Sequence, residues 1–186
     1  IKMHYKMNIA GLDRELKLFP VNENLQIAAF VILSDVEITQ AAARELLAKA
    51  PEFDILMTAE AKSIPLIYEM AKQSGMNNYI VARKGLKVYM ENPISDKVDS
   101  ITTQHTQTLY LGQNEKDLIK GKRVLIVDDV ISTGESLKAL ERLVAKAEGI
   151  VAGKMAILGE GDAIGRDDII VLNQLPVFDK NGNVIR

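Results

Sequence analysis

Two adjacent carboxylates, Asp128 and Asp129, follow four apolar residues in the segment Val124–Ser136, and a cluster of small polar residues comes after them. The cluster reads Ser-Thr-Gly-Glu-Ser and lies where a helix is expected to begin. At such a position, free backbone N–H groups and the positive end of the helix dipole favour a bound phosphate. Glycine lets the backbone approach the anion closely, and the hydroxyl groups add donors. The candidate phosphate site comprises Ser132, Thr133, Gly134, Glu135 and Ser136.

The two carboxylates cannot bind the phosphate themselves, because like charges repel. Their natural partners are hydroxyl groups or a magnesium ion beside the phosphate. Successive residues of a strand point to opposite faces, so Asp128 and Asp129 can face one ligand only if they lie at the strand's end, in the loop. A phosphate flanked by neighbouring hydroxyl groups suggests a ribose 5-phosphate.

A phosphate site accounts for Val124–Ser136 better than a purely structural role or another acidic or phosphate motif does. The acids could be a solvated strand end with Ser132 as a helix cap. Response-regulator receiver domains also close an apolar strand with two acids, but near the start of the domain, whereas about two thirds of this chain precedes the pair. The motif G-x-x-x-x-G-K-[ST] does not occur, and Gly159, Gly161 and Gly165 are one residue out of step with G-x-G-x-x-G.

Apolar runs typical of buried strands alternate along the chain with segments of helical periodicity. This alternation indicates an α/β fold, with a mostly parallel sheet flanked by helices. No repeat or linker interrupts residues 1–186, so we expect a single domain. The expected strands are Ile27–Leu33, Phe53–Met57, Tyr79–Ala82, Leu109–Leu111, Val124–Val127, Val151–Leu158 and Ile169–Leu172; the expected helices cover Thr39–Ala50, Ser63–Gly75 and a stretch from about Glu135 to Val144; Met7–Val21 is expected to be extended or irregular, and Asn181–Gly182 a tight turn.

The segment Gly85–Thr108 is more polar than its surroundings. Long polar connections inside a compact domain are usually functional or mobile, so we expect a mobile loop over about residues 85–108. Glu91 is its candidate for an acid near a substrate. His105 could also touch a substrate, although an exposed loop histidine is the more common case.

Three cations, Arg83, Lys84 and Lys87, open that loop within five residues. Runs of charge are usually solvated surfaces, but the formal net charge is −2, which makes a local basic cluster more informative. Lys62 lies in another loop, before an expected helix that Ser63 can cap. Both groups are candidates for binding an anion.

The composition excludes several classes of site. The chain has no cysteine, so disulfides, thiolate metal sites and cysteine nucleophiles are ruled out. With only two histidines, any metal should be a hard ion bound by oxygens. The acidic net charge and the lack of a long apolar run lead us to expect a cytoplasmic protein that binds neither nucleic acid nor membrane.

The segment Val124–Ser136 resembles the phosphoribosyl-pyrophosphate (PRPP) motif of type I phosphoribosyltransferases. Thr58–Ile64 is similar to the pyrophosphate loop of that family, and Val81–Lys84 resembles the Arg-Lys strand end of its adenine and xanthine members. Ala29–Phe30 lies where the adenine enzymes keep an aromatic residue that stacks on the purine. The resemblance covers roughly Leu18–Leu158 and implies a parallel sheet core with a small hood from the N- and C-terminal parts of the chain.

The resemblance further implies a purine phosphoribosyltransferase, with adenine favoured, that uses Mg²⁺ and forms a homodimer. Its substrates would be PRPP and a purine base, and its products a nucleoside monophosphate and pyrophosphate. Glu60 would only orient its loop, and Phe30 is otherwise a core residue. The implied roles are catalysis and ribose binding by Asp128 and Asp129, which are also candidate contacts for Mg²⁺ carried by PRPP; 5′-phosphate binding by Ser132–Ser136; pyrophosphate binding by Ala61, Lys62, Ser63, Arg83, Lys84 and Lys87; and base binding by Phe30.

Two departures from the family pattern limit these expectations. The Glu-Tyr pair of the adenine enzymes is absent between Gly85 and Thr108, and the pyrophosphate loop reads Ala-Lys-Ser instead of Arg-Gly or Ser-Gly. The first leaves open which base is used and which acid acts on it. The alternative is a regulator of the same fold that binds PRPP or a purine nucleotide without forming a product.

Overall fold

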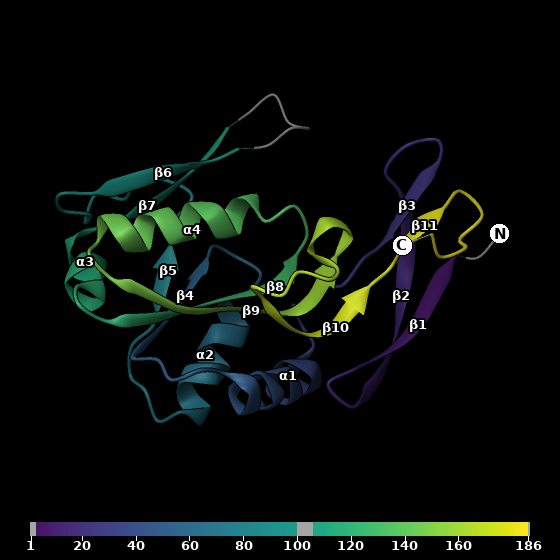
Figure 1. The fold of residues 1–186 in the computed structure, drawn as a ribbon, viewed down its shortest axis with the longest axis horizontal. Coiled ribbons are helices and arrows are strands. Elements are labelled where there is room, and N and C mark those ends of the chain that lie inside the picture. Colours follow the sequence, from purple (N-terminus) through teal and green to yellow (C-terminus); the bar gives the residue numbers. More distant parts are fainter. Residues whose placement is uncertain (1–2, 100–105, 186) are drawn as a thin grey trace.

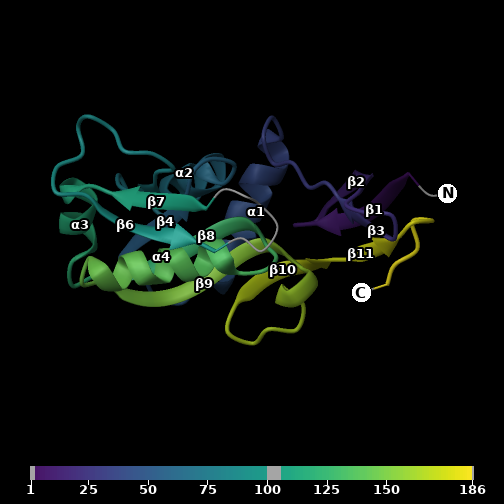
Figure 2. The same cartoon turned by 90° about the horizontal axis from the view of Figure 1, so that it is seen from above.

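The computed structural model describes residues 3–99 and 106–185, and a five-stranded parallel sheet forms its centre (Figures 1 and 2). The strand order is β10-β9-β8-β4-β5. Most residues of β4 and of the first half of β8 are fully buried, which explains their unbroken apolar runs. The strands are β4 (Ile55–Ala59), β5 (Ile80–Ala82), β8 (Arg123–Ile131), β9 (Ile150–Glu160) and β10 (Ile170–Leu175).

Helices cover both faces of this sheet. Helices α1 (Val36–Lys49) and α2 (Ile64–Gln73) lie together on one face, and α4 (Glu135–Lys146) lies on the other (Figure 1). The Asp35 side chain caps α1 by accepting a hydrogen bond from the Ile38 N–H at 3.1 Å. Alternate residues of β8 point to opposite hydrophobic clusters, so one strand contributes to both halves of the core. The predicted α/β fold is confirmed.

An antiparallel pair of strands packs against α4, and a short helix follows that pair in the chain. Strands β6 (Ile94–Val98) and β7 (Gln107–Leu111) pair with each other and precede α3 (Gln113–Ile119). We expected a mobile loop over about residues 85–108, but its described part contains strand β6 and the first residues of β7. The Asp96 carboxylate explains the order, because it forms ion pairs with Arg142 at 2.7 Å and Lys146 at 3.0 Å on α4.

A second, antiparallel sheet forms the hood, which we define as strands β1, β2, β3 and β11, in that order. It lies beyond β10, at one end of the molecule, and includes strands from near both termini (Figure 1). The rings of Tyr5 and Phe178 meet there with their centroids 5.0 Å apart. The hood strands are β1 (His4–Ile9), β2 (Leu12–Pro20), β3 (Leu25–Ala28) and β11 (Val177–Asp179).

The expected strand Ile27–Leu33 is wrong beyond Ala28. Phe30 and Ile32 are buried while Val31 and Leu33 are exposed, so the side chains alternate as in a strand. In the described structure, however, residues 29–33 are not part of any strand. The segment is the passage from the hood to α1. Within residues 3–99 and 106–185, no helix has the length and apolar character needed to cross a bilayer.

Candidate functional site

Strands β4 and β8 separate at their carboxyl ends and leave a crevice in the parallel sheet. They pair only from Ile55–Met57 to Val124–Ile126. The chain continues from β4 to β5 on one side and from β8 to β9 on the other, so the crevice lies at the switch point where open α/β sheets bind ligands. A cavity of about 680 Å³ lies there, lined by Ala59, Glu60, Ala61, Lys62, Ser63, Lys84, Val98, Gln107, Leu109, Asp128, Asp129, Val130 and Ser136.

Asp128 and Asp129 lie inside β8, which continues to Ile131, so their expected position in a loop after the strand is wrong. They nevertheless meet at one hydroxyl group. The Ser63 Oγ donates to Asp128 Oδ1 at 2.8 Å and lies 3.3 Å from Asp129 Oδ1. It also accepts the Asp129 N–H at 2.9 Å. Ser63, at the start of α2, thus takes the place of the missing partner strand and holds both carboxylates at the cavity.

Burial of the Asp128 carboxyl, reinforced by the neighbouring Asp129 carboxylate, raises the pKa of Asp128. Asp129 is only 4% exposed, and its Oδ2 has no hydrogen-bond partner in the described residues. The nearest cation is Lys62, whose Nζ lies 3.6 Å from that oxygen. An unsatisfied buried oxygen is unusual and is ready to accept a ligand hydroxyl group or a cation.

Asp128 and Asp129 are suited to bind a magnesium ion whose other ligands come from a bound substrate. The described residues contain no cluster of three or more acidic, histidine or cysteine side chains that could hold a metal. Mg²⁺ is usually bound by one or two carboxylates together with substrate phosphates and waters. The pair Asp128–Asp129 suits that role and does not form a closed protein site.

The loop after β4 brings a second group of polar residues to the cavity. Ala61 and Lys62 are exposed there, and Ser63 is buried behind them. Glu60 accepts a hydrogen bond from the Lys84 N–H at 2.9 Å and pairs with the Arg83 Nε at 3.3 Å. The Lys84 N–H is the main cause of the lowered pKa of Glu60. Glu60 therefore ties the loop after β4 to the end of β5, consistent with its expected orienting role.

The three cations of the basic run are placed differently. Lys84 lines the cavity. Arg83 donates from Nη1 to the Tyr89 hydroxyl at 2.8 Å and pairs with Glu60, and it is not among the residues that line the cavity. Lys87 lies near enough to Glu60 to lower the pKa of that carboxyl but likewise does not line the cavity. Of the run, only Lys84 is at the cavity in this structure.

The hydroxyl cluster forms an adjoining cavity of about 140 Å³ at the start of α4. Gly134 has φ = +81° and precedes the helix, a conformation that favours glycine. The first turn of α4 has N–H groups that its own ladder cannot use. Burial raises the pKa of the Glu160 carboxyl, and the nearby Ser132 hydroxyl acts in the opposite direction. The lining residues are Asp128, Val130, Ile131, Ser132, Thr133, Gly134, Glu135, Ser136 and Leu137.

The remaining candidates lie elsewhere. Phe30 is 7% exposed within a hydrophobic cluster and lines neither cavity. Glu91 is exposed beside the start of α3, and His105 is outside the described residues. Sequence reasoning missed Gln107 and Glu160. Gln107 offered no pattern, but Glu160 follows an expected strand next to the one with Asp128, and that position could have identified it.

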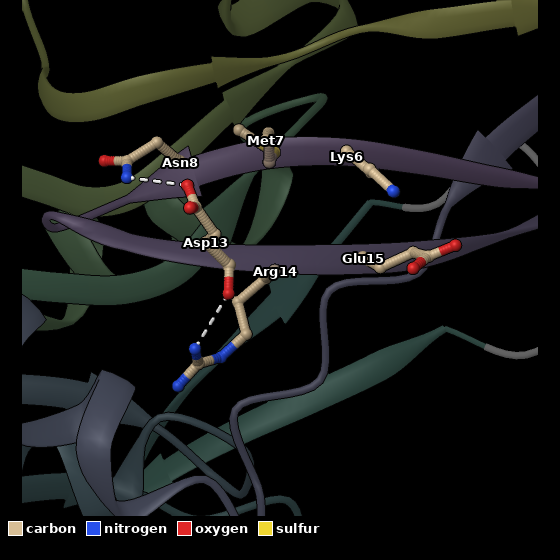
Figure 3. Close-up of a pocket in the computed structure, with 6 residues that line it drawn as sticks. All are labelled: Lys6, Met7, Asn8, Asp13, Arg14 and Glu15. Carbon is tan, nitrogen blue, oxygen red and sulfur yellow. Dashed lines mark hydrogen bonds between the residues drawn. The ribbon is translucent and has the colours of Figure 1, made fainter.

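A further hollow of about 610 Å³ lies on the hood, along the hairpin of β1 and β2 (Figure 3). Arg14 there donates to the Asp13 carbonyl at 2.9 Å and forms two hydrogen bonds with Asp35. Asn8 donates to Asp13 at 3.1 Å. These polar groups bind one another instead of converging on a ligand, and none of them belongs to the predicted motifs.

A family model and several known proteins are similar to this chain. A family model described as phosphoribosyl transferase domain matches residues 33–173. An adenine phosphoribosyltransferase from Brachyspira hyodysenteriae is 44% identical over 64 residues, which are 34% of this chain and 36% of that protein. A hypoxanthine/guanine phosphoribosyltransferase from Methanotorris igneus is 32% identical over 109 residues, 59% of this chain and 55% of that one. The chain therefore covers less than two thirds of either relative.

A solved structure gives a longer match. The adenine phosphoribosyltransferase from Thermoanaerobacter pseudethanolicus superposes with a TM-score of 0.69 at 26% identity, and the match covers 86% of this chain and 95% of that chain.

Proposed function

Because this chain belongs to the phosphoribosyltransferase family, we propose that it transfers the phosphoribosyl group of PRPP to a nitrogen of a purine base, with adenine favoured. Pyrophosphate is the other product. The observation that carries the proposal is the junction of two cavities at Asp128. The smaller cavity is lined by the hydroxyl-rich loop at the start of α4. The larger cavity is lined by the two carboxylates and by the loop that contains Lys62.

In the proposed complex, the 5′-phosphate lies in the smaller cavity. Backbone N–H groups around Gly134 and the hydroxyls of Ser132, Thr133 and Ser136 donate to it, and the dipole of α4 adds positive potential. Glu135 also lines this cavity, and its ion pair with Lys138 at 3.2 Å partly compensates its charge.

The ribose then lies over β8, where Asp128 and Asp129 accept hydrogen bonds from its hydroxyl groups. Breaking the bond to pyrophosphate leaves oxocarbenium-like positive charge on the ribose ring. Carboxylates that are already held by Ser63 stabilise this charge without reorganising during the reaction. Their fixed position also aligns the ribose with the incoming base.

The leaving pyrophosphate lies against the loop Ala61–Ser63, and Lys62 and Lys84 supply positive charge there. Arg83 would have to leave Glu60 to join them, and Lys87 would have to move to the cavity. Asp128 and Asp129 would hold a Mg²⁺ ion that arrives with PRPP, and this ion would help to neutralise the charge of the diphosphate. Phe30 remains our candidate for stacking on the purine, and a homodimer remains the expected assembly.

The test is a product assay with PRPP, Mg²⁺ and each of adenine, hypoxanthine, guanine and xanthine. We expect nucleoside monophosphate and pyrophosphate in equal amounts, fastest with adenine. Faster turnover of another base would overturn the adenine preference alone. Tight PRPP binding without product from any base would favour the regulator.

A further inference from the structure

Beyond the residues already assigned, one arginine lies directly against Gly134 of the phosphate loop, which we define as Ser132–Ser136. Arg166 comes from the segment between β9 and β10, about 30 residues after that loop in the sequence. A Cβ built on Gly134 would lie 2.7 Å from the Arg166 Nη1. The guanidinium therefore occupies the space that any larger residue at position 134 would need. This contact gives Gly134 a second constraint besides its positive φ of 81°.

The orientation of Arg166 is set by a carboxylate on the side away from Gly134. Its Nε and Nη2 donate to the two oxygens of Asp168 at 2.8 and 2.6 Å, a two-pronged arrangement that fixes the guanidinium plane. Asp168 also pairs with Lys154 at 3.1 Å, and Lys154 reaches Glu141 of α4 at 3.1 Å. The Asp168 hydrogen bonds raise the pKa of Arg166, so it stays charged. The hydrogen bonds to Asp168 use Nε and Nη2, and the third nitrogen, Nη1, is the one that lies beside Gly134.

The phosphate loop needs a cation from elsewhere in the chain. The segment Val124–Leu137 contains three acids and no lysine or arginine. Glu160 adds a further carboxyl beside Ser132. Lys138, the first basic residue of α4, already pairs with Glu135. A phosphate dianion bound among these acids gains little from N–H groups alone unless positive charge compensates the surrounding carboxylates.

We propose that Arg166 is a positioning residue for the 5′-phosphate. It holds the Gly134 backbone in the phosphate-binding conformation, and its charge favours the dianionic form of the phosphate. Asp168 fixes the guanidinium so that Nη1 faces the loop. This inference rests on the proposed function, because it assumes that the loop binds the 5′-phosphate of PRPP.

The experiment measures the dissociation constants of ribose 5-phosphate and of magnesium pyrophosphate for wild type and Arg166→Gln. We expect ribose 5-phosphate to bind about 10-fold more weakly to the variant and pyrophosphate to bind unchanged. Arg166→Lys should recover part of the affinity, since it keeps the charge but not the two-pronged contact. Asp168→Asn should fall between wild type and Arg166→Gln.

The matched control is Arg123→Gln. Arg123 also makes two hydrogen bonds with an aspartate, Asp54, but it lies at the opposite end of β8. It should leave both dissociation constants unchanged. Equal weakening of both ligands by Arg166→Gln, or the same loss in the control, would show a general structural effect and overturn the proposal.

The pH dependence of the affinity for ribose 5-phosphate separates the effect of the charge of Arg166 from its effect on the Gly134 backbone. The second phosphate ionisation has a pKa of about 6. If Arg166 selects the dianion, wild-type affinity should rise from pH 5 to pH 7.5 more than the affinity of Arg166→Gln does. Parallel pH profiles would contradict the charge role. If wild type itself fails to bind ribose 5-phosphate, the proposed function fails; if wild type binds it and the variants bind it equally well, the inference about Arg166 fails.

Discussion

At the scale of single residues, the site depends on the carboxylates of Asp128 and Asp129. The fold keeps them close together, and the cation beside them does not cancel their mutual repulsion. Lys62 is 60% exposed and 3.6 Å away from Asp129, so it offsets little of the repulsion. The Ser63 hydroxyl satisfies one oxygen of Asp128, while Asp129 Oδ2 accepts no hydrogen bond from the described residues. This arrangement costs stability and suits a ligand that supplies hydroxyl groups and a metal ion.

Replacing Asp128 by asparagine should stabilise the protein and abolish its proposed activity. The raised pKa of Asp128 means that its stabilising contribution is present below the ordinary carboxyl pKa and is lost as the pH rises through the raised value. Asp128→Asn should therefore be more stable than wild type at pH 8, by about 1–2 kcal/mol, and this gain should be smaller at pH 5. Urea unfolding at both pH values measures this difference.

Turnover of Asp128→Asn should fall by about 100-fold or more, since a fixed charge facing the ribose is lost. Asp117→Asn, on the exposed side of α3, serves as the control and should change neither quantity. A loss of stability at pH 8 that exceeds the loss at pH 5 would contradict our account of the Asp128–Asp129 pair.

Lys62 should act on pyrophosphate and hardly on the 5′-phosphate. Lys62→Met removes the charge while keeping the length of the side chain, and we expect pyrophosphate to bind about 10-fold more weakly. Binding of ribose 5-phosphate should change less than twofold. Isothermal titration with each ligand checks this, with the exposed Lys72→Met on α2 as control. An equal effect on both ligands would place Lys62 between the two subsites and not at one of them.

At the scale of elements, the sequence predicted the order of most core strands and helices because their apolar runs depend on burial against the sheet. It did not predict where β8 ends, because Asp128 and Asp129 interrupt the apolar run after Val127 while pairing with β9 continues to Ile131. The length of a strand depends on hydrogen bonds to the strand beside it, and the residue pattern of one strand alone gives no information about them. The site motif at Asp128–Ser136 could be found because its chemistry is local. Arg166 could not, because only folding brings it to Gly134.

The sequence did not predict the hairpin of β6 and β7, for a different reason. Its residues alternate only weakly, and the ion pairs of Asp96 with Arg142 and Lys146 connect positions nearly 50 residues apart. Asp96 is 10% exposed, so these contacts are better shielded than a surface pair. Val98, Gln107 and Leu109 of the hairpin line the larger cavity, and its attachment to α4 therefore shapes the site.

Asp96→Asn should loosen this hairpin. We expect faster hydrogen exchange in Ile94–Val98 and in Gln107–Leu111, corresponding to about 1–3 kcal/mol of local stability. Burial acts to raise the pKa of Asp96, but Lys146 and Arg142 outweigh it and lower the pKa overall. In wild type, the protection should therefore persist above the ordinary carboxyl range and be lost as the pH falls through the lowered value.

Exchange measured by mass spectrometry at pH 7 checks the effect of Asp96→Asn. Glu148→Gln is the control, because the Glu148–Lys120 pair is about 70% exposed on both sides and should contribute little. If both variants exchange like wild type, the two ion pairs do not anchor the hairpin.

At the scale of the whole molecule, the hood and the parallel sheet share one hydrophobic cluster. Ile9 and Leu16 of the hood belong to the same cluster as Leu56 and Leu125 of the sheet. Arg14 adds a polar link, with hydrogen bonds of 2.8 and 3.0 Å to the cap residue of α1. A shared core predicts that the two sheets unfold together, which is the physical content of the expectation of a single domain over 1–186.

Phe178→Ala tests that expectation. Phe178 is 1% exposed and packs on Tyr5 inside the hood, so its truncation should cost about 3–5 kcal/mol. Because the cluster is continuous with the sheet, calorimetry should show one transition that moves to lower temperature, with the calorimetric and van't Hoff enthalpies equal. The control Phe19→Ala, at a 44% exposed hood position, should shift it much less. A separate low-temperature transition in Phe178→Ala, with the affinity for ribose 5-phosphate retained after it, would instead identify the hood as a second unit that folds on its own.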